Sequence, residues 1–207
     1  KPEEAADNYL NAIEVKPDYV EALSNLGLAY KELGRLPESI ASIQKAITIK
    51  PDYVEAHNNL ANTLLDQGHF YEAVRQLEVA ISHKPQEIGW QIKRSLFFPV
   101  IPASTEQIQD CRNNLMHNIA ALKKTNPSIS DPILEVGMTN FHLAYHDLNN
   151  TRIMEEIASF YIRACPYLEF KSKHCSSLHK RKEERIKIGF ISSYFWDHTI
   201  GKLIRGI

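Results

Sequence analysis

Three Lys-Pro pairs recur at a constant interval of about 34 residues, with their prolines at Pro17, Pro51 and Pro85. The segment DYVEA at residues 18–22 recurs one interval later, at residues 52–56. A repeat period of this length indicates one small helical unit that is repeated and that buries its apolar face against the next unit. Because proline cannot donate a backbone hydrogen bond, each Lys-Pro pair marks the end of a helix. The period therefore predicts a stacked helical array over residues 1–85.

Small and large packing residues recur in the same order within each unit. In the first full unit they are Leu23, Leu26, Gly27, Tyr30, Ile43, Ala46 and Pro51. In the second they are His57, Leu60, Ala61, Leu64, Ala73, Leu77, Ala80 and Pro85, and a leading half-unit contributes Ala5, Tyr9, Ala12 and Pro17. This pattern closely resembles the tetratricopeptide repeat family, an α-solenoid of helix pairs, with Ser39 in place of the usual alanine and His57 in place of a large apolar residue. Gly34 and Gly68 are expected to turn the chain between the two helices of a unit, because glycine adopts a positive φ at little cost.

Asn25 and Asn59 occupy equivalent positions in the two full units, one repeat period apart. Stacked repeats form a concave groove lined by the first helix of each unit. A side-chain amide has donors and an acceptor, so these two residues can hold the backbone of a bound peptide from successive units. The alternative is that both are ordinary solvated helix residues.

Residues 86–170 are expected to form an all-helical connector, because the repeated sequence pattern ends at Pro85 while helical spacing of apolar residues continues. Ser104 followed three residues later by Gln107 is the capping box of a long helix. Another helix is expected from about Thr151 to Cys165.

Asp131-Pro132 predicts one more helix start in the connector, with the aspartate as N-cap and the proline in the first turn. We expect Val136, Phe141 and Tyr145 on the buried side of this helix.

Metal binding is the less favoured interpretation of two groups of ligand-type side chains. Cys165, His174, Cys175 and His179 match no compact structural zinc pattern. His142 and His146 lie four residues apart, but neither an intervening glutamate nor a third ligand accompanies them. We therefore predict no metal site.

Charge divides the chain into an acidic and a basic part. Residues 1–85 carry a net charge of −5 and residues 86–207 a net charge of +4. The basic run at residues 171–184 has no interleaved aromatic residues, which favours a solvated linker over a nucleic-acid site. No apolar run approaches the ~20 residues of a membrane span. The three widely spaced cysteines form no disulfide framework, so we expect a cytoplasmic setting.

Residues 185–207 change from helical to strand character. Ile186, Ile188 and Phe190 predict a buried strand, residues 194–199 a loop, and the apolar residues after Ile200 a helix. A strand, a loop and a helix open an α/β domain, and ligands of such sheets bind beyond the carboxyl ends of the strands. The loop that contains His198 is therefore the expected ligand-binding segment.

The order of repeats, connector and the segment RIKIGFISSYFWDHTIGKLIRGI resembles the O-linked N-acetylglucosamine transferases, in their bacterial, Spindly-like branch. Gly189, Ser192, Ser193, Phe195 and His198 carry this resemblance. The chain departs from the family at Tyr194, where aspartate is usual, and at Lys202, where some members have a second histidine.

The resemblance implies a GT-B fold with two Rossmann-like lobes, of which residues 185–207 would begin the first. It implies inverting transfer of N-acetylglucosamine from UDP-N-acetylglucosamine to Ser or Thr of acceptor proteins, without an obligatory metal or other cofactor. His198 matches a residue near the reaction, as a base or as a positioning group. Asn25 and Asn59 match an asparagine ladder that holds the acceptor polypeptide.

Both ends of the sequence look cut, so we expect the N-terminal part of a longer enzyme, inactive alone because it lacks a donor lobe. The alternative is a non-catalytic tetratricopeptide scaffold that binds peptide partners.

Overall fold

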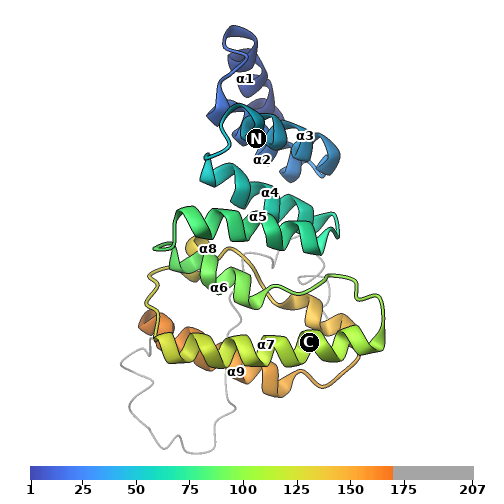
Figure 1. Cartoon of the computed structure of the whole chain (residues 1–207), viewed down its shortest axis with the longest axis vertical. Coiled ribbons are helices and arrows are strands. Elements are labelled where there is room, and N and C mark those ends of the chain that lie inside the picture. Colours follow the sequence, from blue (N-terminus) through green and yellow to red (C-terminus); the bar gives the residue numbers. More distant parts are fainter. Residues whose placement is uncertain (170–207) are drawn as a thin grey trace, which may run out of the picture. The chain divides into compact units, whose positions relative to one another are not determined.

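The computed structural model describes residues 1–169, which are mainly helical (Figure 1). The repeat helices are α1 (Pro2–Val15), α2 (Val20–Glu32), α3 (Leu36–Ile49), α4 (Val54–Asp66) and α5 (Phe70–His83). The helices that follow are α6 (Ile88–Leu96), α7 (Thr105–Thr125), α8 (Pro132–Glu135) and α9 (Thr151–Ala164), with 3₁₀ turns η1 (Phe141–His146) and η2 (Pro166–Glu169). No strand occurs within residues 1–169. The strand, loop and helix expected over residues 185–207, and His198 with them, lie outside the described residues.

Helix pairs stack in the order that the period predicts. α2 packs on α3, α4 packs on α5, and α3 contacts α4 to join the two full units (Figure 1). Gly34 and Gly68 have φ values of +74° and +90°, which confirms their predicted role at the turns. The two prolines at the seams lie just beyond α3 and α5, where they end the second helix of each unit.

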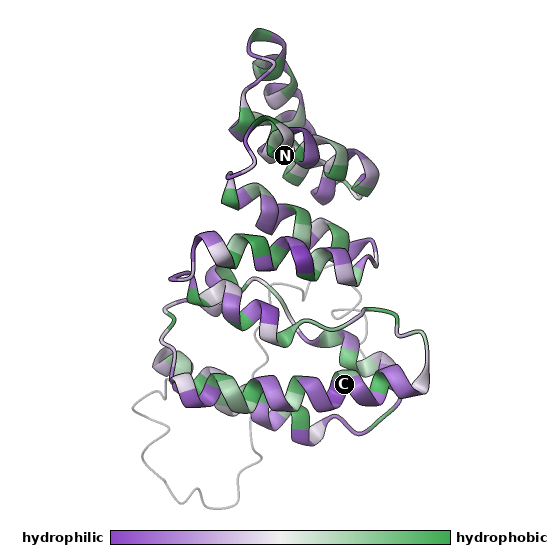
Figure 2. Cartoon of the chain, in the orientation of Figure 1, coloured by the Kyte–Doolittle hydropathy of each residue, from purple (hydrophilic) through white to green (hydrophobic). Residues whose placement is uncertain are grey.

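Small residues at the packing positions let the helices of the array approach closely. Gly27 shows the limit: a Cβ atom at this position would lie 2.3 Å from Cγ1 of Ile43, well inside van der Waals contact. The buried residues of the array core are Val20, Leu23, Ile43, Ala46, Ala56, Leu60, Ala61, Leu64, Ala73, Leu77 and Phe97. Each helix in Figure 2 carries both apolar and polar residues, as expected for helices with one buried face.

The two departures from the repeat pattern are satisfied by local hydrogen bonds. The hydroxyl of Ser39 lies 3.3 Å from the hydroxyl of Thr63, which joins α3 to α4. The buried ring of His57 contacts the side chain of Gln76 at 2.7 Å and the carbonyl oxygen of Pro51 at 2.9 Å. A polar ring is therefore accommodated where the pattern usually has a large apolar residue.

α6 extends the helix spacing by one more step. It begins at Ile88, one repeat period after α4 begins at Val54, just as α4 begins one period after Val20. α6 therefore stands in the register of a first repeat helix, although the residues at its packing positions no longer match the repeat pattern.

The connector helices surround a second core. Its buried residues are Ile92, Leu96, Phe98, Leu115, Ile119, Leu122, Ile129, Val136, Leu143, Ile153, Ile157, Phe160, Ala164 and Cys165. The predicted start of α7 is confirmed, because the Ser104 hydroxyl accepts a hydrogen bond from the Gln107 backbone N–H at 3.1 Å. The predicted helix from Thr151 is confirmed as α9.

The prediction for the segment after Asp131 is correct at its start and wrong at its end. Asp131 caps α8 as expected, and Val136 is buried. Phe141 and Tyr145, however, are 64% and 65% exposed. The helix ends at Glu135, and Gly137 then takes a φ of +65°. The chain resumes in the separate turn η1, so the helical spacing that placed these aromatics inside does not extend to them.

Candidate functional site

Three residues at equivalent helix positions define the candidate site. Asn25, Asn59 and Lys93 follow one another at the repeat period, and each is the sixth residue of its helix, in α2, α4 and α6. We call this set the ladder. The repeat pattern of the sequence predicts the first two members but not Lys93, because that pattern ends at Pro85. Counting one further period from Asn59 would have found it.

Hydrogen bonds at equivalent positions join α2 to α4 and α4 to α6. Nδ2 of Asn59 donates to the hydroxyl of Ser24 at 3.1 Å. Nζ of Lys93 donates to Oδ1 of Asn58 at 3.3 Å and to Oδ1 of Asn62 at 3.1 Å. Ser24 and Asn58 each stand 35 residues before their donor, so the contact repeats with the array.

Lys93 differs from the asparagines in carrying a charge. Its side chain is buried, with 4% of the residue exposed. Burial, and secondarily the nearby charge of Lys31, lowers the pKa of Lys93 to about 8. Since this value still lies above neutral pH, the amine is mostly protonated at pH 7. No described carboxylate pairs with it, and Lys31 is itself paired with Asp66 at 3.0 Å.

A small cavity of about 220 Å³ lies beside the ladder, between the array and the connector. Lys31, Asn62 and Asp66 line it from α2 and α4. Met138 and His142 line it from the connector. The volume accommodates one side chain or several waters. Asn62, which lines this cavity, also accepts a hydrogen bond from Lys93 of the ladder.

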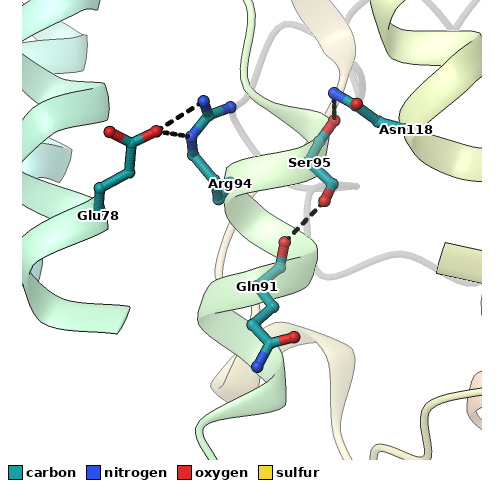
Figure 3. Close-up of polar contacts among 5 residues, drawn as sticks. All are labelled: Glu78, Gln91, Arg94, Ser95 and Asn118. Atoms are coloured by element: carbon teal, nitrogen blue, oxygen red, sulfur yellow. Dashed lines mark hydrogen bonds and ion pairs between the residues drawn. The ribbon is translucent and has the colours of Figure 1, made fainter. Parts of the chain in front are cut away.

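Polar contacts join α6, the helix that carries Lys93, to α5 and to α7. Figure 3 shows these contacts. Arg94 donates from Nε and Nη2 to Oε1 of Glu78 on α5, at 2.9 Å and 2.7 Å. Asn118 on α7 donates from Nδ2 to the carbonyl oxygen of Ser95 at 3.0 Å. α6 is thus held between the array and the connector by polar contacts on two sides.

The histidine pair of the connector does not form a metal site with other described residues, since no group of three His, Cys, Asp or Glu side chains gathers within residues 1–169. His146 is 4% exposed, and neither ring nitrogen has a hydrogen-bond partner in the described structure. Burial, with a smaller effect of Arg112, lowers the pKa of His146. Three members of the other group, His174, Cys175 and His179, lie outside the described residues.

Family models match the N-terminal part of the chain. A TPR repeat model matches residues 1–34 and 27–68, and a tetratricopeptide repeat model matches residues 56–82. These residues are therefore tetratricopeptide repeats, a class of repeat that binds peptide partners, and the fold is a mainly helical repeat solenoid. No curated protein matches the sequence. Within residues 1–169, no helix combines the length and the apolar character needed to cross a bilayer.

Two solved structures are similar to this chain at low sequence identity. An O-GlcNAc transferase mutant from Thermobaculum terrenum is 17% identical, with a TM-score of 0.44 over 61% of this chain and 24% of that chain. MamA is 18% identical, with a TM-score of 0.46 over 77% of this chain and 84% of that chain. The sequence thus spans about a quarter of the length of the transferase.

Proposed function

We propose that α1–α6 form a peptide-binding module whose concave surface, lined by α2, α4 and α6, holds an extended polypeptide. The observation that carries this proposal is the ladder, with equivalent polar side chains on successive first helices. Repetition at a constant spacing suits a ligand that itself repeats, and the backbone of an extended peptide offers a donor and an acceptor at every residue. Asn59 keeps its Oδ1 acceptor for such a ligand while Nδ2 contacts Ser24.

The test is peptide binding by the double variant Asn25→Ala, Asn59→Ala. A display library of short random peptides is selected on the full chain, and the selected peptides are titrated against each variant. The double variant is expected to bind about tenfold more weakly, the loss expected from two removed hydrogen-bonding side chains. Gln44→Ala, an exposed amide on the second-helix side of the array, is the matched control and should bind normally. Unchanged affinity of a folded double variant would reject the groove.

A second, finer proposal is that this module presents acceptor proteins to a protein O-glycosyltransferase. The observation that favours it is the segment at residues 185–207, with Gly189, Ser192, Phe195 and His198 in the family pattern. Here the donor is UDP-N-acetylglucosamine, and the acceptors are Ser and Thr hydroxyls. The reaction needs a group that takes the hydroxyl proton and groups that stabilise the departing diphosphate. His198 is the candidate for the proton or for positioning.

Sugar transfer separates this proposal from a non-catalytic scaffold that uses the same groove. The chain of residues 1–207 and a version extended through any downstream sequence are incubated with UDP-N-acetylglucosamine and a selected peptide that contains Ser or Thr. We expect transfer by the extended protein, loss of transfer in its His198→Ala variant, and none by residues 1–207 alone. Peptide binding without transfer by the extended protein would favour the scaffold.

A further inference from the structure

A cavity of about 390 Å³ lies in the connector, where α9 begins beside α7. Its volume is within the range of small-molecule binding sites. The residues that line it are Gln109, Arg112, Asn113, Met116, Arg152 and Ile153. Two of them are arginines and none is acidic, so the lining favours a ligand that carries negative charge.

The guanidinium group of Arg112 lies at the N-terminal end of α9. Its Nη2 donates to the carbonyl oxygen of Asn149 at 2.6 Å, and its Nη1 donates to Oδ1 of Asn150. Both acceptors are neutral, so they satisfy two of the five N–H donors without neutralising the charge. Arg112 is only 9% exposed, and a buried cation without an anion is costly. An anion in the cavity would therefore stabilise this side chain.

Arg152, the second residue of α9, brings another positive charge to the same end of the helix. Within residues 1–169, neither Arg112 nor Arg152 takes part in an ion pair. Glu156, one turn further along α9, is paired with Lys123 instead. The cavity thus brings together two arginines that no described carboxylate pairs with.

Backbone N–H groups at the beginning of α9 add further donors. The N-cap residue Asn150 makes no side-chain capping bond, because its side chain contacts Arg112 and the carbonyl oxygen of Leu143. The N–H groups of Arg152 and Ile153, two residues that line the cavity, have no acceptor within the described part of the chain. Free N–H groups at the positive end of a helix favour an anion.

We propose that this cavity binds the phosphate group of a phosphate monoester. Such a group carries close to two negative charges at pH 7, which match the two arginines. Its oxygens accept paired hydrogen bonds from a guanidinium group and single ones from the N–H groups of a helix. Met116 and Ile153 provide apolar contact for the rest of the ester. All the lining residues belong to the connector, so this proposal does not depend on peptide binding by the ladder.

Titration calorimetry with phenyl phosphate tests the site. Phenyl sulfate carries one charge fewer and is expected to bind the wild type about tenfold more weakly. Arg152→Gln and Arg112→Lys should each weaken the binding of phenyl phosphate about tenfold or more, because each removes a guanidinium group. Arg75→Gln, at an exposed arginine of α5, is the matched control and should bind normally. In two-dimensional NMR spectra, the amide signals of Arg152 and Ile153 should shift as phenyl phosphate is added.

A phosphoserine peptide, titrated beside its serine counterpart, distinguishes the two sources of such a group. Tighter binding of this peptide than of phenyl phosphate would assign the site to a modified protein, and the reverse order to a small molecule. Absence of binding at millimolar phenyl phosphate, or equal affinity for phenyl sulfate, would overturn the proposal. So would an affinity that neither arginine variant lowers. Arg152 is exposed, so Arg152→Gln keeps the test valid if Arg112→Lys fails to fold.

Discussion

Phe97 and Phe98 are adjacent in the chain, yet their rings are buried in two different hydrophobic cores. Phe97 packs with the array residues, and Phe98 packs with the connector residues. Met138 is partly buried and packs against both cores. The array and the connector are therefore joined by apolar packing at Phe97, Phe98 and Met138.

Phe97→Ala and Phe98→Ala are expected to destabilise different parts of the molecule. Each removes a buried ring, which typically costs about 3–5 kcal/mol. Hydrogen exchange should rise in α4 and α5 for Phe97→Ala, and in α7 and α9 for Phe98→Ala. Phe141→Ala removes an exposed ring and serves as the control, with a change within about 0.5 kcal/mol. Identical exchange patterns in the two variants would contradict the separation of the cores.

Gly27→Ala is expected to destabilise the array by about 1–3 kcal/mol, because the added methyl overlaps Ile43. Urea unfolding measures the change. The loss of stability is then compared among Gly27→Ala, Ile43→Ala and the variant that carries both changes. Because Ile43→Ala shortens the side chain that the added methyl would overlap, the methyl has room in the double variant. The double variant should therefore lose less stability than the two single losses combined. Additive losses would show that the overlap is relieved elsewhere.

His146→Leu is expected to stabilise the connector by about 1–3 kcal/mol at pH 7, since it removes two buried nitrogens that have no partner in the described structure. The pKa of His146 is lowered in the folded state. As pH falls below the unfolded value near 6.5, the unfolded chain binds a proton that the folded chain resists. The wild type should therefore lose stability toward acid more steeply than the variant. His117→Gln, at an exposed histidine of α7, is the control and should show the wild-type profile. Parallel profiles for His146→Leu would contradict the assignment.

The sequence predicted the array well because its period repeats both the apolar positions and the breaks between helices. The prediction failed at α6, where the packing residues change although the helix keeps the repeat spacing. Gln91, Arg94 and Ser95 stand where α4 has His57, Leu60 and Ala61, and this change of packing residues concealed α6 as a repeat helix. Lys93 was concealed with it, so two thirds of the ladder could be read from the pattern.

Helical spacing did not predict which residues after Asp131 are exposed. The prediction assumed one continuous helix in this segment, but α8 ends after one turn. The positive φ of Gly137 interrupts the segment, and η1 turns Leu143 and His146 inward instead of Phe141 and Tyr145. Which side of a short 3₁₀ turn is buried depends on contacts with distant helices, and a local pattern does not contain them.

Lys93→Met is expected to be more stable than the wild type at pH 7, with a difference that shrinks at alkaline pH. The pKa of Lys93 is about 8 in the folded chain and near 10.5 when unfolded. Between these values the unfolded state binds more protons, so wild-type stability rises with pH, by up to about 1.4 kcal/mol per unit. The variant lacks this contribution.

Urea unfolding at pH 7, 8, 9 and 10 measures the gap in free energy of unfolding between the wild type and Lys93→Met. Burial raises the pKa of Tyr161 to about 12, but this residue is common to both proteins and cancels in the comparison. A gap that stays constant would contradict the buried charge.

Asn59→Ala and Asn25→Ala are expected to differ in stability although they occupy equivalent ladder positions. Nδ2 of Asn59 donates to the Ser24 hydroxyl, and its loss should cost about 0.5–1.5 kcal/mol. No side-chain hydrogen bond joins Asn25 to another residue of the described range, so Asn25→Ala should change stability by less than about 0.5 kcal/mol. Ser24→Ala should reproduce the cost of Asn59→Ala, and the double change should cost little more than either alone, because both remove the same bond. Equal effects of the two asparagine changes would show that the bond to Ser24 does not hold α4 against α2.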